Sequence, residues 1–234
     1  MDVRFITNPE GLLRIAVEAG DSARYLVLQD GTGASAAGCE VDYEISLAEG
    51  ASLKMVFLSL DGTLLRNRLR VSLSGPGASC DLSGLSLSGS GQDIGYDIVL
   101  THHVPQCHST QLFKNIVGGS GVTRFFGLVK VVPDAQKTEA YQANHNLLLS
   151  EEARAFTRPQ LEIYADDVKC SHGATVGRLN PDELFYMRSR GITLAEAKLL
   201  QQLAFTGEVL EKIDDALLRE KMQALVGERL GNLR

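Results

Sequence analysis

The 234-residue sequence has no tryptophan, few aromatic residues and no long apolar run. Aromatic residues make up 6% of the chain, so the ring surfaces typical of a sugar-binding groove are scarce. No window approaches the roughly twenty apolar residues of a membrane span. The first residues, MDVRFITNPE, contain no apolar segment of the kind found in secretory signals. We therefore expect a cytoplasmic protein that does not cross a membrane.

Basic residues are fewer than acidic residues in this chain. The chain has 23 Lys and Arg against 29 Asp and Glu, a formal net charge of −6. A nucleic-acid or anionic-membrane surface needs a basic field, so neither partner is expected. No phosphate-binding loop, dinucleotide-binding glycine motif or nucleophile elbow occurs. The sequence thus has no ATPase, dehydrogenase or hydrolase signature of its own.

Cysteine is sparse and widely spaced. The four residues are Cys39, Cys80, Cys107 and Cys170, with no C-x-x-C pair. This spacing excludes a zinc ribbon, a thioredoxin-like motif and a local four-cysteine iron–sulfur site. In a reducing compartment these residues are expected to be free thiols.

Residues 1–177 have the pattern of strands separated by turns. Short apolar or alternating runs are bounded by Gly, Ser, Asp and Pro, and no capped helical pattern interrupts them. A turn-like triplet recurs at Gly20, Gly50 and Gly77, with intervals of 30 and 27 residues. The pattern leaves a sandwich, a barrel or a β-solenoid open, and the loose period favours the solenoid. The clearest predicted strands are residues 12–19, 24–29, 40–47, 53–60, 64–73, 94–101 and 127–132.

Residues 178–234 have a helical pattern and form a second predicted domain. Asn180 is a candidate N-cap with Pro181 at the first helical position, and Gly191 is expected to end this helix. Thr193 and Glu196 form a capping box that opens a second helix. A third helix is predicted over residues 213–230, with Leu218, Met222 and Leu225 on one stripe. Three such helices cannot bury both of their faces against one another. The tail must therefore dock on the β region, on another protein, or on both.

Three segments carry candidate chemistry. The first, EIYADDVKCSHGATVG, places Cys170 and His172 on one face of an extended strand, because strand side chains alternate. Both are metal-ligand types, but two ligands alone are insufficient and partners must come from elsewhere. A buried thiol beside a hydrogen-bonded imidazole is the alternative that the residues alone favour.

The second segment, THHVPQCHST, contains His102, His103, Cys107 and His108 around a proline. By residue parity His102 would share a face with His108, and His103 with Cys107. No H-x-x-H or H-E-x-x-H helix pattern supports a permanent metal site here, so a polar strand end or turn is the favoured interpretation.

The third segment, residues 141–167, carries two acidic pairs. Glu151 with Glu152 and Asp166 with Asp167 would be the acids of a β-solenoid enzyme acting on carbohydrate. Adjacent acids in a turn are more often solvated, and the scarcity of aromatic residues argues against this function.

From about residue 90 onward the sequence resembles the core of the SufB/SufD family, and within it the SufD branch. The motifs that carry the resemblance are VPQCHSTQLFKNIV, YQANHNLLLS, CSHGAT and LFYMRSRGI. The resemblance implies a mainly β fold, a right-handed parallel β-helix followed by a small C-terminal α-helical domain. It also implies a non-catalytic scaffold subunit in iron–sulfur cluster assembly.

The resemblance further implies two partners. A SufB paralogue would pair through the β-helix edges, and the SufC ATPase would dock on the helices from Pro181 onward. The residues implied for this docking are Phe185, Tyr186, Arg188 and Arg190. His172 and Cys170 would be transient ligands of iron or a nascent cluster at the SufB–SufD interface, with no stably bound cofactor.

Two departures from the SufB branch stand out. Gly173 occupies the position of the carboxylate in that branch's HEAT motif, and Asn144 aligns with its cluster-building cysteine. A complete cluster site is therefore not expected in this chain alone. A homodimeric cluster scaffold is a second alternative, and it requires Cys107 or Cys170 to face a symmetry mate. Strands are expected almost from the first residues of the given sequence, so the helical segment usual in the family is not expected within it.

Overall fold

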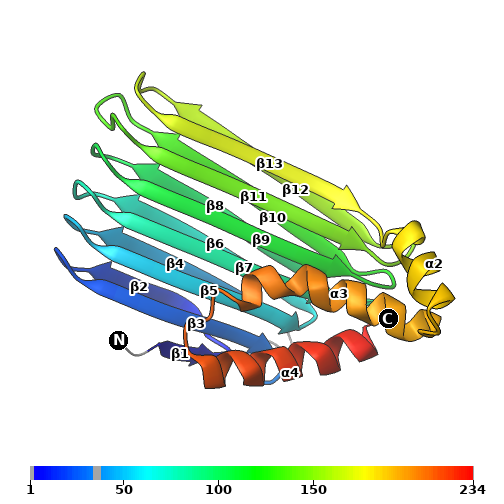
Figure 1. The fold of residues 1–234 in the computed structure, drawn as a ribbon. Helices are drawn as coiled ribbons and strands as arrows, with labels where there is room; N and C mark the ends of the chain where they lie inside the picture. The colour runs from blue at the N-terminus through cyan, green and yellow to red at the C-terminus, as the bar shows by residue number, and fades with distance from the viewer. Residues whose placement is uncertain (1–2, 34–37, 234) are drawn as a thin grey trace.

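The chain forms a parallel β-solenoid with three helices after it, in a computed structural model that describes residues 3–33 and 38–233. The strands alternate between two sheets as the chain advances, so each coil contributes one strand to each sheet (Figure 1). The seven-stranded sheet contains, in order, β1 (Arg4–Thr7), β3 (Ser22–Asp30), β5 (Ser52–Asp61), β7 (Ser79–Ser88), β9 (His108–Val117), β11 (Glu139–Leu148) and β13 (Lys169–Gly177). The six-stranded sheet contains β12 (Arg154–Ile163), β10 (Val122–Val131), β8 (Asp93–His102), β6 (Leu64–Leu73), β4 (Cys39–Leu47) and β2 (Gly11–Val17).

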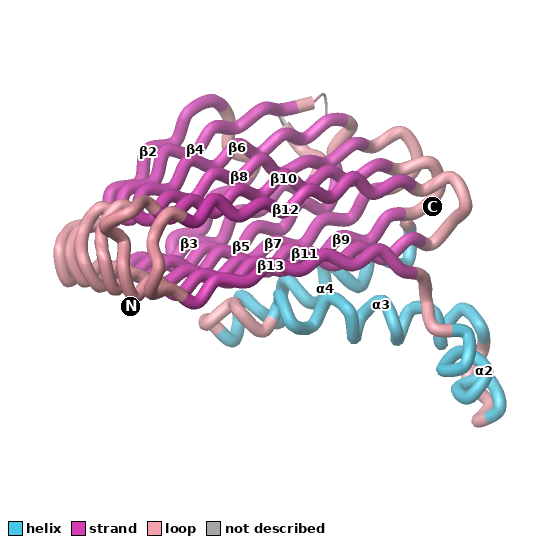
Figure 2. Tube along the Cα trace, turned by 90° about the horizontal axis from the view of Figure 1, so that it is seen from above, coloured by secondary structure: helices cyan, strands magenta, loops and turns pink. Residues whose placement is uncertain are grey.

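The coils stack in register along the solenoid. Every strand pairs in parallel with the strand two positions along the chain, as when Tyr141 lies opposite Thr110 and Ser171. Seen from above, the two sheets lie face to face, with the turns gathered at their ends (Figure 2). The favoured prediction of a β-solenoid is confirmed. Among the described residues the strands form two open sheets of parallel pairs, which is neither the antiparallel pairing of a sandwich nor a sheet closed into a barrel.

The recurring turn triplet stacks one turn on the next. Gly20, Gly50 and Gly77 all have positive φ, at 74°, 62° and 71°, which favours glycine. The Gly20 N–H donates to the Glu49 carbonyl at 2.8 Å, and the Gly50 N–H donates to the Pro76 carbonyl at 2.9 Å. The period seen in the sequence is therefore the period of the coil.

The core lies between the two sheets and contains a row of aromatic rings. Tyr43, Phe57, Tyr96, Phe113 and Phe125 are each almost fully buried. Successive ring centroids in this row are 5.4, 5.9, 4.9 and 5.2 Å apart. Such edge-to-face and tilted pairs add specific attraction to the burial of the rings.

The helices follow the last strand and are capped as the sequence predicts. Asn180 caps the first of them and accepts the N–H groups of Asp182 and Glu183. Thr193 and Glu196 form the capping box of the second, and Gly191 between the two has φ +90°. The three helices are α2 (Pro181–Ser189), α3 (Leu194–Leu210) and α4 (Ala216–Asn232).

Helices α3 and α4 lie against the outer face of the seven-stranded sheet (Figures 1 and 2). Val209 and Val226 belong to a second apolar cluster together with Leu58, Leu85 and Ile116 of the sheet. Of the three docking alternatives left open for the tail, the structure shows these two helices on the β region. Helix α2 contains no buried residue and projects to the side of the solenoid, beyond the C-terminal ends of the strands and next to α3 (Figure 2). No helix in the described part of the chain is long and apolar enough to cross a membrane.

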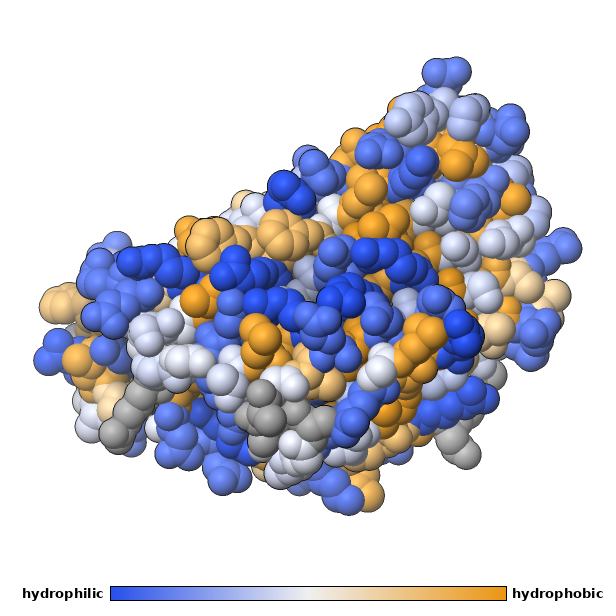
Figure 3. All heavy atoms as spheres, turned by 180° about the vertical axis from the view of Figure 1, so that it is seen from behind, coloured by the Kyte–Doolittle hydropathy of each residue, from blue (hydrophilic) through white to orange (hydrophobic). Residues whose placement is uncertain are grey.

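The outer face of the six-stranded sheet is left uncovered by the helices. Figure 3 shows hydrophilic bands crossing this face between apolar ones. Arginines and acids from neighbouring coils pair here, as in Arg14–Glu44 at 2.8 Å and Arg70–Asp97 at 3.0 Å. Each such exposed pair contributes little to stability, on the order of 0–1 kcal/mol.

Candidate functional site

Cys170 and His172 lie on β13, the last strand of the seven-stranded sheet. Their in-register neighbours on β11 are Ala140 and Gln142, both of which are buried between the sheets. Because side chains keep their parity across a parallel pair, Cys170 and His172 face the solenoid interior. No further coil of the described residues covers β13, so this interior is open at its end. The prediction that the two residues share a face is confirmed.

The two side chains differ in their exposure. Cys170 is half-buried and packs against the main core cluster. Burial raises the pKa of its thiol, so the thiol stays protonated at neutral pH and is a poor ligand until it loses a proton. His172 is exposed at the open end of the solenoid. The imidazole is therefore the more accessible of the two ligand types.

Asn144 lies one coil below Ala174 and is completely buried. Its Nδ2 donates to the Phe113 carbonyl at 3.2 Å, and its Oδ1 accepts the Asn146 side chain at 2.7 Å. The amide therefore satisfies buried backbone and side-chain groups. This role suits asparagine, and it places no thiolate at this point in the interior.

The histidine-rich segment is divided between the inside and the outside of the solenoid. His102 ends β8, is fully buried, and its Nε2 lies 2.9 Å from the Ser109 hydroxyl. Burial, with smaller contributions from His108 and His103, lowers the pKa of His102 to about 4, so the ring is neutral near pH 7. His103 is exposed in the turn, and the Nδ1 of His108 lies outside, 3.8 Å from Glu139.

The prediction that His102 shares a face with His108, and His103 with Cys107, is wrong. The parity argument requires a continuous strand, whereas a turn over residues 103–107 separates β8 from β9. Cys107 in this turn is 1% exposed, and its Sγ contacts the Gly75 carbonyl at 3.4 Å. A thiol so buried does not face a symmetry mate, which leaves Cys170 as the cysteine that the homodimeric alternative requires.

The two acidic pairs lie at opposite ends of β12. Glu151 and Glu152 precede this strand, while Asp166 and Asp167 follow it. Ten strand residues span about 33 Å, far more than the roughly 10 Å that separates the carboxylates of a glycosidase. Glu151 also pairs with Arg178 at 2.6 Å. The structure therefore does not bring the two pairs together as catalytic acids.

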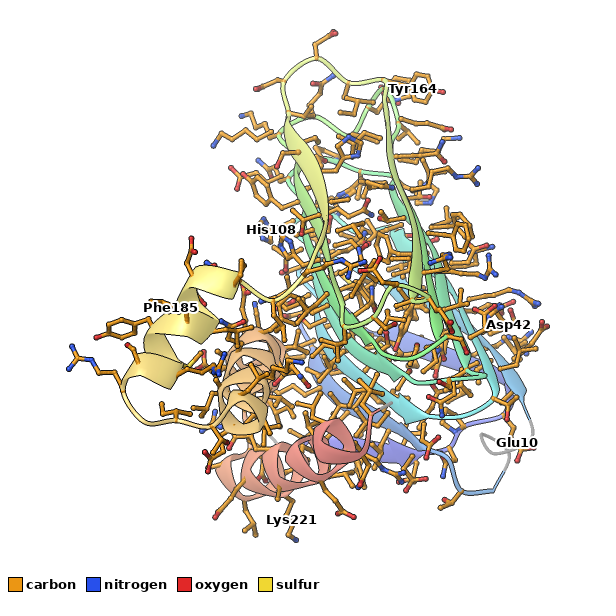
Figure 4. All side chains as sticks on the ribbon, turned by 90° about the vertical axis from the view of Figure 1, so that its right-hand side faces the viewer. Glu10, Asp42, His108, Tyr164, Phe185 and Lys221 are labelled. Carbon is orange, nitrogen blue, oxygen red and sulfur yellow. The ribbon has the colours of Figure 1, made fainter. Side chains whose placement is uncertain are left out.

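The four residues implied in ATPase docking lie on or just after α2. Phe185 is 75% exposed and Tyr186 is 59% exposed, and the Arg190 guanidinium lies 5.3 Å from the Tyr186 ring centroid. Figure 4 shows Phe185 pointing away from the solenoid. Arg188 is in the last turn of the helix. Exposed aromatic rings beside arginines are typical of the centres of protein–protein interfaces.

Nowhere in residues 3–33 and 38–233 do three His, Cys, Asp or Glu side chains converge to hold a metal ion. Cys170 and His172 thus stand as two ligand types at an open end. What the sequence did not indicate is the polar lining beneath His172, formed by the buried amides of Gln142 and Gln111, its register partners in the next two coils. The spacing of 31 residues between these two glutamines, close to the coil period, is the signal that relates them.

A family model and individual relatives of known name indicate the same family for this chain. The model of the SufBD core domain, described as SUF system FeS cluster assembly, matches residues 9–205. The chain is 38% identical over 187 residues to the iron–sulfur cluster assembly protein SufD of Escherichia coli, covering 80% of the chain and 44% of that relative.

Two further relatives agree. A SufBD family protein of Synechocystis is 37% identical, over 79% of the chain and 41% of the relative. The chloroplastic protein ABCI7 of Arabidopsis thaliana is 35% identical, over 92% of the chain and 45% of the relative. The chain spans less than half the length of each of these relatives.

Proposed function

The chain belongs to the SufBD core family of iron–sulfur cluster assembly proteins, and from this membership we propose that it is a non-catalytic scaffold subunit of that machinery. In this role it pairs with a SufB paralogue and docks the SufC ATPase. Iron or a nascent cluster is its transient cargo. The Escherichia coli relative is named as an iron–sulfur cluster assembly protein, which supports a scaffold.

The observation that carries the proposal is the open end of the solenoid. Strand β13 pairs only with β11, and β12 pairs only with β10, among the described residues. Two neighbouring strand edges therefore present unpaired backbone N–H and C=O groups. A partner with a similar solenoid end can add its strands to both edges. The SufB paralogue suits this place because it belongs to the same family.

The same end carries the candidate ligands. An imidazole binds iron when neutral and releases it on protonation, and His172 is exposed where the partner would seat. Cys170 lies two residues away on the same face of the strand. Two ligand types from one subunit leave the remaining positions to the partner, which is what an inter-subunit site requires.

Helix α2 supports the second half of the proposal. It buries no residue of its own against the solenoid, yet it presents Phe185 and Tyr186 to solvent beside Arg188 and Arg190. An apolar patch that stays uncovered in the chain is an interaction surface. We assign this patch to the ATPase, whose binding would connect nucleotide-driven motion to the solenoid end.

The first test is co-purification of the chain with SufB and SufC, comparing wild type with His172→Ala. We expect the His172→Ala complex to form normally but to hold several-fold less iron and sulfide after reconstitution. His103→Ala is the matched control, because His103 is also exposed but lies in the turn between β8 and β9. A wild-type chain that binds neither partner would refute the proposed function.

A second arm separates the two docking surfaces. The double variant Phe185→Ser with Tyr186→Ser should lose SufC binding and keep SufB binding, with unchanged thermal stability because both rings are exposed. Leu217→Ser is the control, since Leu217 is a 64% exposed apolar residue on α4. Loss of SufC binding in the control alone would place the ATPase surface on α4. A chain that dimerises alone and assembles a cluster without SufB would favour the homodimeric scaffold.

A further inference from the structure

The solenoid interior contains columns of polar side chains, one from each successive coil. Gln111 on β9, Gln142 on β11 and His172 on β13 are register partners and form one such column. Neighbouring strands lie about 4.8 Å apart, a spacing that lets one amide donate to the next. A second column shows the same behaviour, because Asn115 Nδ2 donates to Asn146 Oδ1 at 2.7 Å.

Gln142 is the middle residue of the first column and is 3% exposed. Its Nε2 donates to Gln111 Oε1 at 3.0 Å, which directs that side of the amide toward the coil below. Its Oε1 is buried and has no hydrogen-bond partner among the described residues. A buried carbonyl oxygen without a donor costs on the order of 1–3 kcal/mol, so a donor is expected next to it.

The amide of Gln142 is fixed in place by the opposite sheet. A Cβ added to Gly127 on β10 would lie 2.5 Å from Gln142 Nε2 and 2.9 Å from its Cδ, so the amide occupies the space that this glycine leaves. The residue one coil above Gly127 is Pro159, which has neither a backbone N–H nor a polar side chain. Pro159 therefore supplies no donor at this rung, and the nearby buried hydroxyl without a partner on the opposite sheet, that of Thr157, lies two residues away on β12.

Gln111 Nε2 is also buried without a partner, but the bond from Gln142 Nε2 to Gln111 Oε1 occupies that side of the Gln142 amide. On the other side of the column, the residue directly above Gln142 is His172 on β13. We propose that Gln142 is a positioning residue for His172: when the exposed His172 ring turns toward the column, one of its ring N–H groups donates to Gln142 Oε1, which is otherwise without a partner. The other ring nitrogen then presents its lone pair at the open end of the solenoid. The inference rests on the proposed function only in assigning that lone pair to iron or a nascent cluster.

The physical benefit is a single tautomer and a fixed ring orientation. Histidines that ligate metals usually donate their second ring N–H to a carbonyl or carboxylate, and removing that partner weakens metal binding about 10–100-fold. Here the acceptor is anchored two coils deep, through Gln111, before any partner subunit arrives. The imidazole is thus oriented by this chain alone.

The test is ¹⁵N NMR of the histidine rings in the full chain, with His172 assigned from His172→Ala. Wild type should give a slowly exchanging ring N–H signal and one predominant tautomer for His172. Gln142→Met, which keeps the side-chain length without an acceptor, should abolish this signal. Gln142→Glu, which keeps an acceptor oxygen, should retain it. Thr157→Val is the control, because its Oγ1 is a buried, unpartnered polar atom on the opposite sheet, and its spectrum should match wild type.

An absent ring N–H signal in wild type, or an equal signal in Gln142→Met, would overturn the inference. A Zn²⁺ titration of the same proteins gives a second readout, with Kd expected to be about 10–100-fold weaker in Gln142→Met. Both readouts use the chain without partners. If they behave as expected while no SufB complex forms, the positioning role stands and the proposed function fails. If the complex forms and Gln142→Met changes neither readout, the positioning role fails alone.

Discussion

The contact between Gly84 and Phe113 makes a sharp test of how the solenoid interior is packed. The two residues are register partners on β7 and β9, and Phe113 is fully buried. A Cβ added to Gly84 would lie 2.4 Å from both Cδ1 and Cε1 of Phe113. Gly84→Ala therefore forces the ring out of place, and we expect a loss of about 1–3 kcal/mol in the free energy of unfolding.

Phe113→Val removes the ring atoms that meet this Cβ and retains a β-branched residue suited to a strand. It also removes the ring contacts with Tyr96 and Phe125, at 4.9 and 5.2 Å. We expect this variant alone to cost about 2–4 kcal/mol, somewhat less than a Phe→Ala change in a core.

In the Phe113→Val background, Gly84→Ala should no longer lower the free energy of unfolding. With the ring gone, the added methyl group fills part of the cavity and restricts the unfolded chain, so Gly84→Ala should be neutral or stabilising by about 0.5–1 kcal/mol. The coupling energy between the two sites is then about 2 kcal/mol. Urea unfolding of the four proteins measures it. Costs that add within about 0.5 kcal/mol would refute the inferred packing.

Two further predictions concern acid stability. His102 is buried with a pKa lowered to about 4, so between about pH 6.5 and pH 4 the unfolded state binds a proton that the folded state does not. Stability should fall by up to about 3 kcal/mol over this range, and His102→Gln should flatten the pH profile of the unfolding midpoint. The Lys114 ammonium, 2.5 Å away, is the main cause of the lowered pKa of Glu208. The stability that this ion pair contributes is fully present above the pKa that Glu208 has in the unfolded chain. It is lost as the pH falls through the lower pKa that Glu208 has in the folded chain. Because Glu208 is 58% exposed, screening limits the effect to about 1 kcal/mol or less, and Glu208→Gln should remove this acid-dependent part in urea titrations at low salt. An unchanged acid limb in either variant would contradict the assignment.

The parts of the fold that depend on neighbouring residues could be predicted from the sequence. The caps at Asn180 and Thr193 involve contacts within a few positions, so the motif and the structure coincide. The turn triplet at Gly20, Gly50 and Gly77 indicated the coil because each turn needs positive φ. The resemblance supplied the parallel β-helix itself, which the pattern had left as one of three choices.

The later strands were harder to recognise because their interior is polar. Interior positions of β9 and β11 are occupied by amides such as Gln111, Asn115 and Gln142, so apolar and polar residues do not alternate cleanly there. The face shared by Cys170 and His172 was predictable from strand geometry. The support beneath His172 was not, because it depends on the register between coils about 30 residues apart.

The docked helices also divide the solenoid into parts of unequal stability. Salt bridges connect the segment between α3 and α4 to the early coils. Asp214 pairs with Lys54, and Lys212 pairs with Asp81. In a stacked array each coil is held chiefly by its nearest neighbours. The coil that carries β13 has one neighbour among the described residues and lies outside this brace. Its local opening free energy is therefore expected to be the lowest of the body, so the candidate binding end can loosen and re-form around cargo while the braced coils stay folded.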